Sequence, residues 1–143
     1  MKDQKGRPLP SLIYGTAWKE ERTKDLVKLA LQKGFRGIDT ANQPKHYQEP
    51  LVGEALKEIY SDGLTREELF IQSKFTPAGG HDHRVPYDLS KPLSKRVLES
   101  FESSLQNLGT DYLDSYLLHG PHSYPGLSKE DHEVWKAIEE IYK

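Results

Sequence analysis

Short apolar runs alternate with longer amphipathic segments along the whole chain. The apolar runs, each the length of one strand, lie at residues 11–15, 35–39, 69–74 and 111–120. Segments in which apolar residues recur every three to four positions lie at 23–33, 49–60, about 93–108 and 129–142. The pattern therefore predicts four strand–helix units in succession.

Local signals mark where these helices begin and end. Thr23 is a candidate N-cap for the first helix, and Gly34 is its stop. Pro50 suits the first turn of the second helix, and Ser128 is a candidate cap for the last one. The capping-box sequence "TREE" at 65–68 predicts a short turn before the third strand.

The connections between the strands restrict the architecture. Helical connections imply parallel pairing with right-handed crossovers. Two α/β architectures satisfy this rule: a four-stranded doubly wound sheet and half of a (β/α)8 barrel. Neither G-x-G-x-x-G nor G-x-x-x-x-G-K-[ST] follows the first strand, which weakens the case for a doubly wound, nucleotide-binding sheet. With 143 residues the chain has the length of one domain.

Several chemically distinctive residues lie where the predicted strands end. In parallel α/β structures the carboxyl ends of the strands face the functional surface, so side chains from neighbouring ends converge. The candidates are Gly15, Thr16 and Trp18 at the first strand, Asp39 and Tyr47 after the second, Lys74 on the third and His119 on the fourth.

The ionisable members of this set fit a tuned general acid. A phenol has a pKa of about 10, and a nearby ammonium lowers the pKa of a phenol. We expect Lys74 to act on Tyr47 in this way, with Asp39 as the counter-charge of the ammonium. His119 is placed to orient a carbonyl oxygen. The set suits hydride delivery to an aldehyde or ketone, and the hydride implies a nicotinamide cofactor.

Five sequence blocks resemble, in order, those of the aldo-keto reductases. The blocks are "YGTAW", "GFRGIDTA", "HYQEPLVGEAL", "LFIQSKF" and "SLQNLGTDYLDSYLLHGP". The resemblance implies a (β/α)8 TIM barrel, NADPH (NADP) as cofactor and small carbonyl compounds as substrates. It also implies a catalytic tetrad of Asp39, Tyr47, Lys74 and His119, with Tyr47 as the proton donor.

The same resemblance assigns binding roles and a boundary. It places Gly15, Thr16 and Asp39 near the nicotinamide, and Trp18 and His119 at the substrate. A complete barrel usually needs about 250 residues. We therefore expect residues 1–143 to form one partial domain, the N-terminal half of a barrel that is incomplete without its C-terminal half. In the family that second half carries most contacts to the pyrophosphate and the 2′-phosphate of the cofactor.

Two other functions remain open at this point. The first is a truncated, catalytically inactive half-barrel that acts as an interaction module. The second is a metal-dependent hydrolase built on Asp39, Lys74 and His119, although no H-x-H follows the first strand. The motifs "HDH" (81–83) and "HGPH" (119–122) could hold a metal, but solvated loop histidines explain them more simply, so we expect no metal site.

Composition and charge argue against nucleic acid and a membrane as partners of this protein. The 20 basic and 22 acidic residues are mixed along the chain, unlike a nucleic-acid footprint. No apolar run is long enough to span a membrane. The absence of cysteine and of an apolar leader favours a cytoplasmic protein. We expect open sheet edges and an apolar inner face to promote self-association, and the long loop at 75–92 to lie over the substrate mouth.

Overall fold

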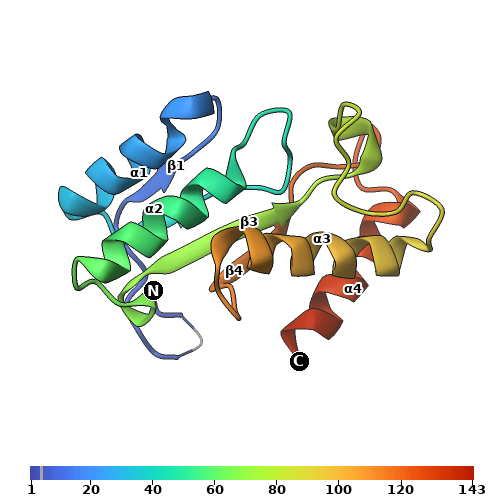
Figure 1. The fold of residues 1–143 in the computed structure, drawn as a ribbon. Helices are drawn as coiled ribbons and strands as arrows, with labels where there is room; N and C mark the ends of the chain where they lie inside the picture. The colour runs from blue at the N-terminus through green and yellow to red at the C-terminus, as the bar shows by residue number, and fades with distance from the viewer. Residues whose placement is uncertain (4) are drawn as a thin grey trace.

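The computed structural model describes residues 1–3 and 5–143, and strands and helices alternate along this part of the chain (Figure 1). In chain order the elements are β1 (Ile13–Gly15), α1 (Thr23–Gln32), β2 (Gly37–Asp39), α2 (Glu49–Ser61), β3 (Phe70–Phe75), α3 (Leu93–Leu108), β4 (Ser115–Leu118) and α4 (Lys129–Tyr142). Short 3-10 turns lie at Glu20–Arg22, Arg66–Glu68 and Ala78–Gly80. The predicted succession of strand–helix units is confirmed.

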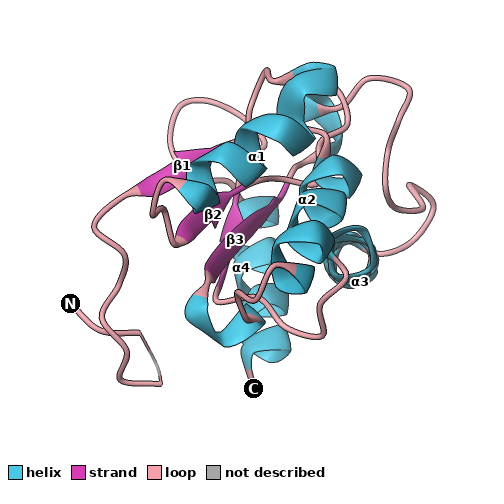
Figure 2. Cartoon of the chain, turned by 60° about the vertical axis from the view of Figure 1, so that its left-hand side comes forward, coloured by secondary structure: helices cyan, strands magenta, loops and turns pink. Residues whose placement is uncertain are grey.

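The strands form a parallel sheet in the order β1-β2-β3-β4. Neighbours in sequence are thus neighbours in the sheet, whereas a doubly wound sheet reverses its strand order partway across. Sequential order with right-handed crossovers places successive helices on the same face. Figures 1 and 2 show α1, α2 and α3 side by side across that face, and α4 packs against α3. This open, one-sided arrangement is that of a partial (β/α)8 barrel.

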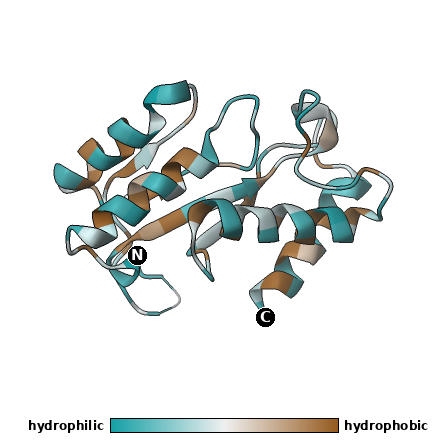
Figure 3. Ribbon diagram, in the orientation of Figure 1, coloured by the Kyte–Doolittle hydropathy of each residue, from teal (hydrophilic) through white to brown (hydrophobic). Residues whose placement is uncertain are grey.

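The core lies between the sheet and its helices. Side chains alternate along a strand, so Ile38, Ile71 and Phe75 point toward the helices and are buried there. Ile38 and Ile71 pack with residues of α1 and α2, and Phe75 packs with Val97 of α3 and Val134 of α4. Figure 3 shows brown, hydrophobic bands on β3 and on the helices. The presence of Phe75 between α3 and α4 places both helices on one side of the sheet.

The opposite face of the sheet carries a hydrogen-bonded row of polar side chains. Ser115 Oγ donates to Gln72 Oε1 over 2.8 Å, and Gln72 Nε2 donates to Asp39 Oδ1 over 2.7 Å. Lys74 Nζ donates to the second oxygen of Asp39. The expectation of an apolar inner face is therefore wrong for the middle of the sheet. The same alternation that buries Ile38 and Ile71 turns these polar neighbours to the uncovered side.

Most helix-boundary signals are confirmed, but one is wrong. Ser128 accepts a hydrogen bond from Asp131 N over 3.2 Å and caps α4, and Thr65 caps the turn at Arg66–Glu68. Thr23 is not an N-cap: it is the first residue of α1, and its hydroxyl donates to Glu20 O over 2.7 Å. The preceding 3-10 turn already supplies the entry into α1, so the hydroxyl turns back to that turn.

The loop after β4 is tied to the start of α4. The buried Asp131 accepts hydrogen bonds from the backbone N–H of His122 over 2.9 Å and from the backbone N–H of Ser128 over 2.8 Å. Its carboxylate also contacts the His122 ring at 2.6 Å. This anchoring gives the segment that begins at His119 a defined path away from the sheet.

Candidate active site at the carboxyl ends of the strands

The carboxyl ends of the strands form one edge of the sheet, and backbone pairing continues one residue beyond them. Thr16 N donates to Asp39 O over 3.1 Å, and His119 N donates to Phe75 O over 2.8 Å. A threonine directly follows each of the first three strands, at positions 16, 40 and 76, and all three side chains are buried. The ends are therefore packed closely enough to hold side chains from different strands against one another.

Asp39 and Lys74 form an ion pair at the centre of this edge. Lys74 Nζ lies 2.8 Å from Asp39 Oδ2, and the two side chains are 12% and 22% exposed. The ammonium also donates to Thr40 O over 3.0 Å, and Gln72 binds the other carboxylate oxygen. Additional hydrogen bonds of this kind are what a partly buried ion pair needs to offset its desolvation. Lys74 is thus supplied with the counter-charge that the sequence predicted.

Tyr47 is brought to the ion pair by the loop after β2. Its backbone N–H donates to Gln43 O over 2.9 Å, and Gln43 Nε2 in turn donates to Gly80 O over 2.6 Å. Lys74 Nζ lies 5.1 Å from the centroid of the Tyr47 ring, within the range of a cation–π contact. Among the described residues, none forms a hydrogen bond with the Tyr47 hydroxyl. The ammonium therefore lies over the ring, and the phenol O–H remains available to a substrate.

His119 completes the set. Its ring lies edge-on to the Tyr47 ring, with centroids 5.6 Å apart, and its Nδ1 lies 2.8 Å from Thr76 Oγ1. Burial and the Lys74 ammonium lower the pKa of His119 below its ordinary value, although Asp39 opposes the change. The imidazole is accordingly neutral near pH 7 and suits hydrogen bonding to a substrate better than proton donation.

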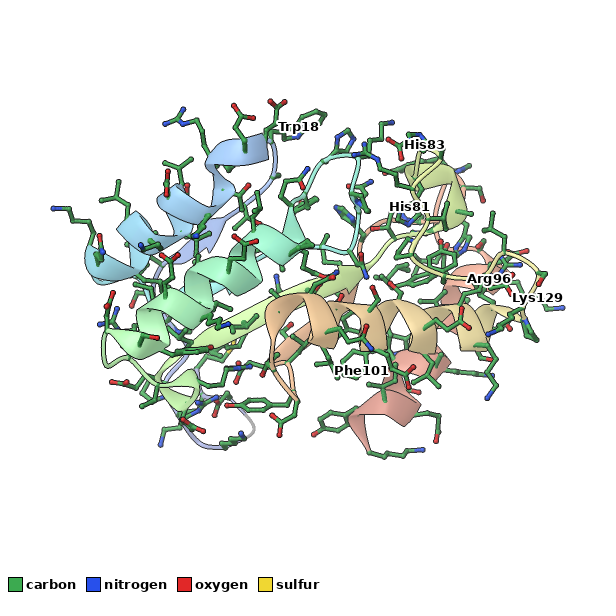
Figure 4. The ribbon with its side chains drawn as sticks, viewed as in Figure 1. Trp18, His81, His83, Arg96, Phe101 and Lys129 are labelled. Carbon is green, nitrogen blue, oxygen red and sulfur yellow. The ribbon has the colours of Figure 1, made fainter. Side chains whose placement is uncertain are left out.

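Trp18 lies at the rim of the site. Its ring contacts that of His46 in a tilted arrangement, with centroids 3.8 Å apart and an angle of 36° between the ring planes. The backbone N–H of Trp18 also donates a 2.8 Å hydrogen bond to His46 O. The residue is 67% exposed and has a φ of 61°, which turns the chain sharply after β1. Figure 4 shows Trp18 along the same upper side of the molecule as His81. This position fits an aromatic that contacts a substrate.

Gly15 and Thr16 have different surroundings. Gly15 pairs with Asp39 in the register of β1 and β2, and a Cβ added to it would meet no atom within 4 Å. The sheet is thus open above Gly15. Thr16 is fully buried, and its hydroxyl donates to Asp39 O over 2.8 Å. Thr16 fixes the backbone of Asp39, and a direct contact between Thr16 and a cofactor stays a prediction.

The loop after β3 is anchored next to the loop after β2, which contains Tyr47. Its 3-10 turn at Ala78–Gly80 receives the Gln43 hydrogen bond, and Tyr87 OH donates to Thr76 O over 2.8 Å. His81 Nε2 lies 3.1 Å from the same carbonyl oxygen. The loop therefore contacts the side of the site that contains His119, and its expected place over the substrate mouth stays a prediction.

Three residues that complete these contacts were not assigned roles from the sequence: Gln72, Thr76 and His46. Gln72 lies two positions before Lys74, so strand periodicity alone places both on one face. Thr76 lies two positions after Lys74, but its contact with His119 depends on strand register, and the contact of His46 depends on the path of a loop. The described part of the chain contains no group of three or more side chains placed to hold a metal ion. No described helix is long and apolar enough to cross a membrane.

Comparisons with known proteins give a consistent result. A family model described as Aldo/keto reductase family matches residues 11–143. The chain is 40% identical over 141 residues to an uncharacterized oxidoreductase of Bacillus subtilis, YtbE. The aligned region covers 96% of this chain and 44% of YtbE. It is 39% identical over 118 residues to the glyoxal reductase of the same organism, with 82% of this chain and 34% of the relative covered.

The fold comparison agrees with the sequence comparison. The structure superposes on an aldo-keto reductase of the silkworm Bombyx mori complexed with NADPH, with a TM-score of 0.73 and 28% identity. The match covers 99% of this chain and 43% of the silkworm protein. The chain thus spans less than half the length of these relatives.

Proposed function

Because the chain belongs to the aldo/keto reductase family, we propose that it supplies the catalytic residues of an NADPH-dependent reductase of small aldehydes or ketones. One observation carries the proposal: the Asp39–Lys74 ion pair, the Tyr47 ring and the His119 ring lie together at the carboxyl edge of the sheet. The proposal assigns catalysis to the tetrad, cofactor contact to Gly15, Thr16 and Asp39, and substrate contact to Trp18 and His119.

Each residue of the tetrad has a distinct task in this proposal. His119 binds the carbonyl oxygen and orients it toward Tyr47. The Tyr47 phenol gives its proton to that oxygen as negative charge develops there. The Lys74 ammonium stabilises the phenolate that remains, and Asp39 keeps the ammonium in place. When NADPH is bound, it supplies the hydride that reduces the carbonyl carbon.

The residues of the sheet edge fit the nicotinamide end of such a cofactor. The space above Gly15 is open, and Asp39 presents a fixed carboxylate beside it. A planar ring can approach a strand closely only where no Cβ projects, which Gly15 provides. The fit concerns the nicotinamide end alone, and we propose that the phosphates are held by chain beyond these residues.

The test is a chimera that joins residues 1–143 to the C-terminal portion of YtbE, the 40% identical relative. With glyoxal as the substrate and NADPH as the cofactor, we expect substrate-dependent loss of NADPH absorbance. A chimera that folds, binds NADPH and consumes none in the presence of glyoxal or of several simple aldehydes would contradict the proposal. A chimera in which the second half is joined to an unrelated four-unit sheet serves as the background.

We also propose that the 143-residue chain, studied by itself, self-associates. β1 and β4 are the outer strands of the described sheet, and unpaired strand edges favour pairing with another chain. Beside β4 lies a groove lined by aromatic side chains that include Tyr116, Trp135 and Tyr142. We expect light scattering to give a mass above the 16.4 kDa of one chain. A monodisperse monomer at micromolar concentration would contradict this expectation.

Two further features of the proposed function concern its setting. We propose a cytoplasmic reductase, because a chain with no cysteine suits a reducing compartment. We propose that it acts on small molecules and not on nucleic acid, because its charge is nearly balanced, with a formal net value of -2.

A further inference from the structure

Thr76 contacts His119 because the register of β3 and β4 extends beyond the strands. Phe75 is the register partner of Leu118, so the next residues, Thr76 and His119, face one another. Their side chains meet at 2.8 Å between Thr76 Oγ1 and His119 Nδ1. Thr76 is only 3% exposed, so water has little access to this contact.

The orientation of the Thr76 side chain is held on two sides. Gly80 packs against its methyl group so closely that a Cβ on Gly80 would lie 2.6 Å from Thr76 Cγ2. The carbonyl oxygen of Thr76 accepts a hydrogen bond from Tyr87 OH and contacts His81 Nε2. With its backbone and its methyl group fixed, Thr76 presents its hydroxyl to His119.

The hydrogen bond between Thr76 and His119 can form with either residue as the donor, and the two arrangements differ in free energy. If His119 Nδ1 carried the proton and donated it, the Thr76 hydroxyl would have no acceptor for its own hydrogen among the described residues. A buried donor without a partner costs more than an unused lone pair on an oxygen that already donates. If the Thr76 hydroxyl donates instead, Nδ1 is the acceptor and Nε2 must carry the proton of the neutral ring.

The choice between tautomers exists because the ring is neutral. Burial lowers the pKa of His119, and so do Lys74, His46 and His81, while Asp39 opposes them. In a neutral imidazole one nitrogen donates and the other accepts, and the partner of one nitrogen decides which form is present.

We propose that Thr76 is a positioning residue that holds His119 in the tautomer with its proton on Nε2, so that this N–H is directed to the carbonyl oxygen of the substrate. The second clause rests on the proposed reductase function. In the opposite tautomer a lone pair on Nε2 would face the lone pairs of the carbonyl oxygen, which disfavours binding in the reactive orientation. Within the segment "KFTP" the site therefore requires a hydroxyl at position 76 as well as the ammonium of Lys74.

The tautomer is tested in the 143-residue chain itself, without any activity. We expect ¹⁵N chemical shifts of the histidine rings to show His119 with a protonated Nε2 in the natural chain. Thr76→Val keeps the branched shape and removes the hydroxyl, so it should populate both tautomers. Thr76→Ser keeps the hydroxyl and should restore the natural spectrum, while the ring of the exposed His132 serves as an internal control in each variant.

Kinetics in the chimera with YtbE test the use of that tautomer. Thr76→Val should lower kcat/KM by about tenfold, the effect of one neutral hydrogen bond, and Thr76→Ser should recover most of it. A natural chain with protonated Nδ1, or a Thr76→Val chain with an unchanged His119 tautomer, would overturn the assignment to Thr76. If Thr76→Val does not fold, Thr76→Ala tests the same loss. An inactive natural chimera would overturn the reductase function and leave the tautomer to be judged by the spectra.

Discussion

Replacement of Tyr47 by phenylalanine in the chimera should lower kcat by about two to four orders of magnitude, the usual contribution of a positioned general acid. The variant keeps the ring and with it the contacts to Lys74 and His119, at 5.1 Å and 5.6 Å respectively. It removes only the hydroxyl, which forms no hydrogen bond with the described residues. The fold should therefore be unaffected, and the change in kcat should report the lost proton.

The design separates this loss from general damage. Tyr124→Phe is a matched control, because it removes the same atom from a side chain that is 86% exposed and has no role in the proposed site. Both variants should melt within a degree or two of the parent and should bind NADPH equally well. If Tyr47→Phe keeps reductase activity within about tenfold of the parent, Tyr47 is not the acid, and His119 becomes the candidate.

Much of the fold could be predicted because the pattern of strands and helices leaves few topologies. Right-handed crossovers and sequential order follow from the alternation itself, and the structure has the order β1-β2-β3-β4. The ends of the elements were less predictable. Thr23 has a side chain typical of an N-cap, yet Arg22, the last residue of the turn at Glu20–Arg22, occupies the N-cap position of α1. Residue type cannot reveal whether another turn already precedes a helix.

The candidate site could be predicted in part: the sequence indicates which residues meet, but not how Tyr47 is placed. Asp39, Lys74 and His119 come together because parallel strand ends converge, which the sequence pattern implies. The position of the ammonium over the Tyr47 ring could not be predicted. It depends on the loop after β2, whose path is held by the bond from Gln43 to Gly80, 37 positions away in the chain.

Register explains why Thr76 was missed. The fourth strand is predicted to lie within residues 111–120 without exact bounds, and β4 spans Ser115–Leu118. A shift of one residue between β3 and β4 would separate Thr76 from His119 and turn neighbouring side chains to the other face. A pattern of apolar residues does not fix pairing to one residue, so a contact of this kind is visible only in the structure.

The Asp39–Lys74 pair has both a structural and a catalytic part, and a pair of variants can separate them. Lys74→Met removes the ammonium and leaves the partly buried carboxylate with Gln72 and no counter-charge. Breaking such a pair is more costly than replacing both partners. We therefore expect Lys74→Met to be less stable to urea than Asp39→Asn/Lys74→Met, in which the remaining amide is uncharged and keeps its contact with Gln72.

Activity should behave differently from stability in these variants. Lys74→Met should lower kcat by about 10²-fold or more, because it removes the charge that stabilises the phenolate. The double variant should regain stability and no activity, since the ammonium is still absent. Lys91→Met, which breaks the exposed pair with Glu99, is the matched control and should change neither property appreciably. A double variant that recovers kcat along with stability would show that Lys74 only holds Asp39 in the fold. Recovery of stability alone would place the catalytic effect in the ammonium itself.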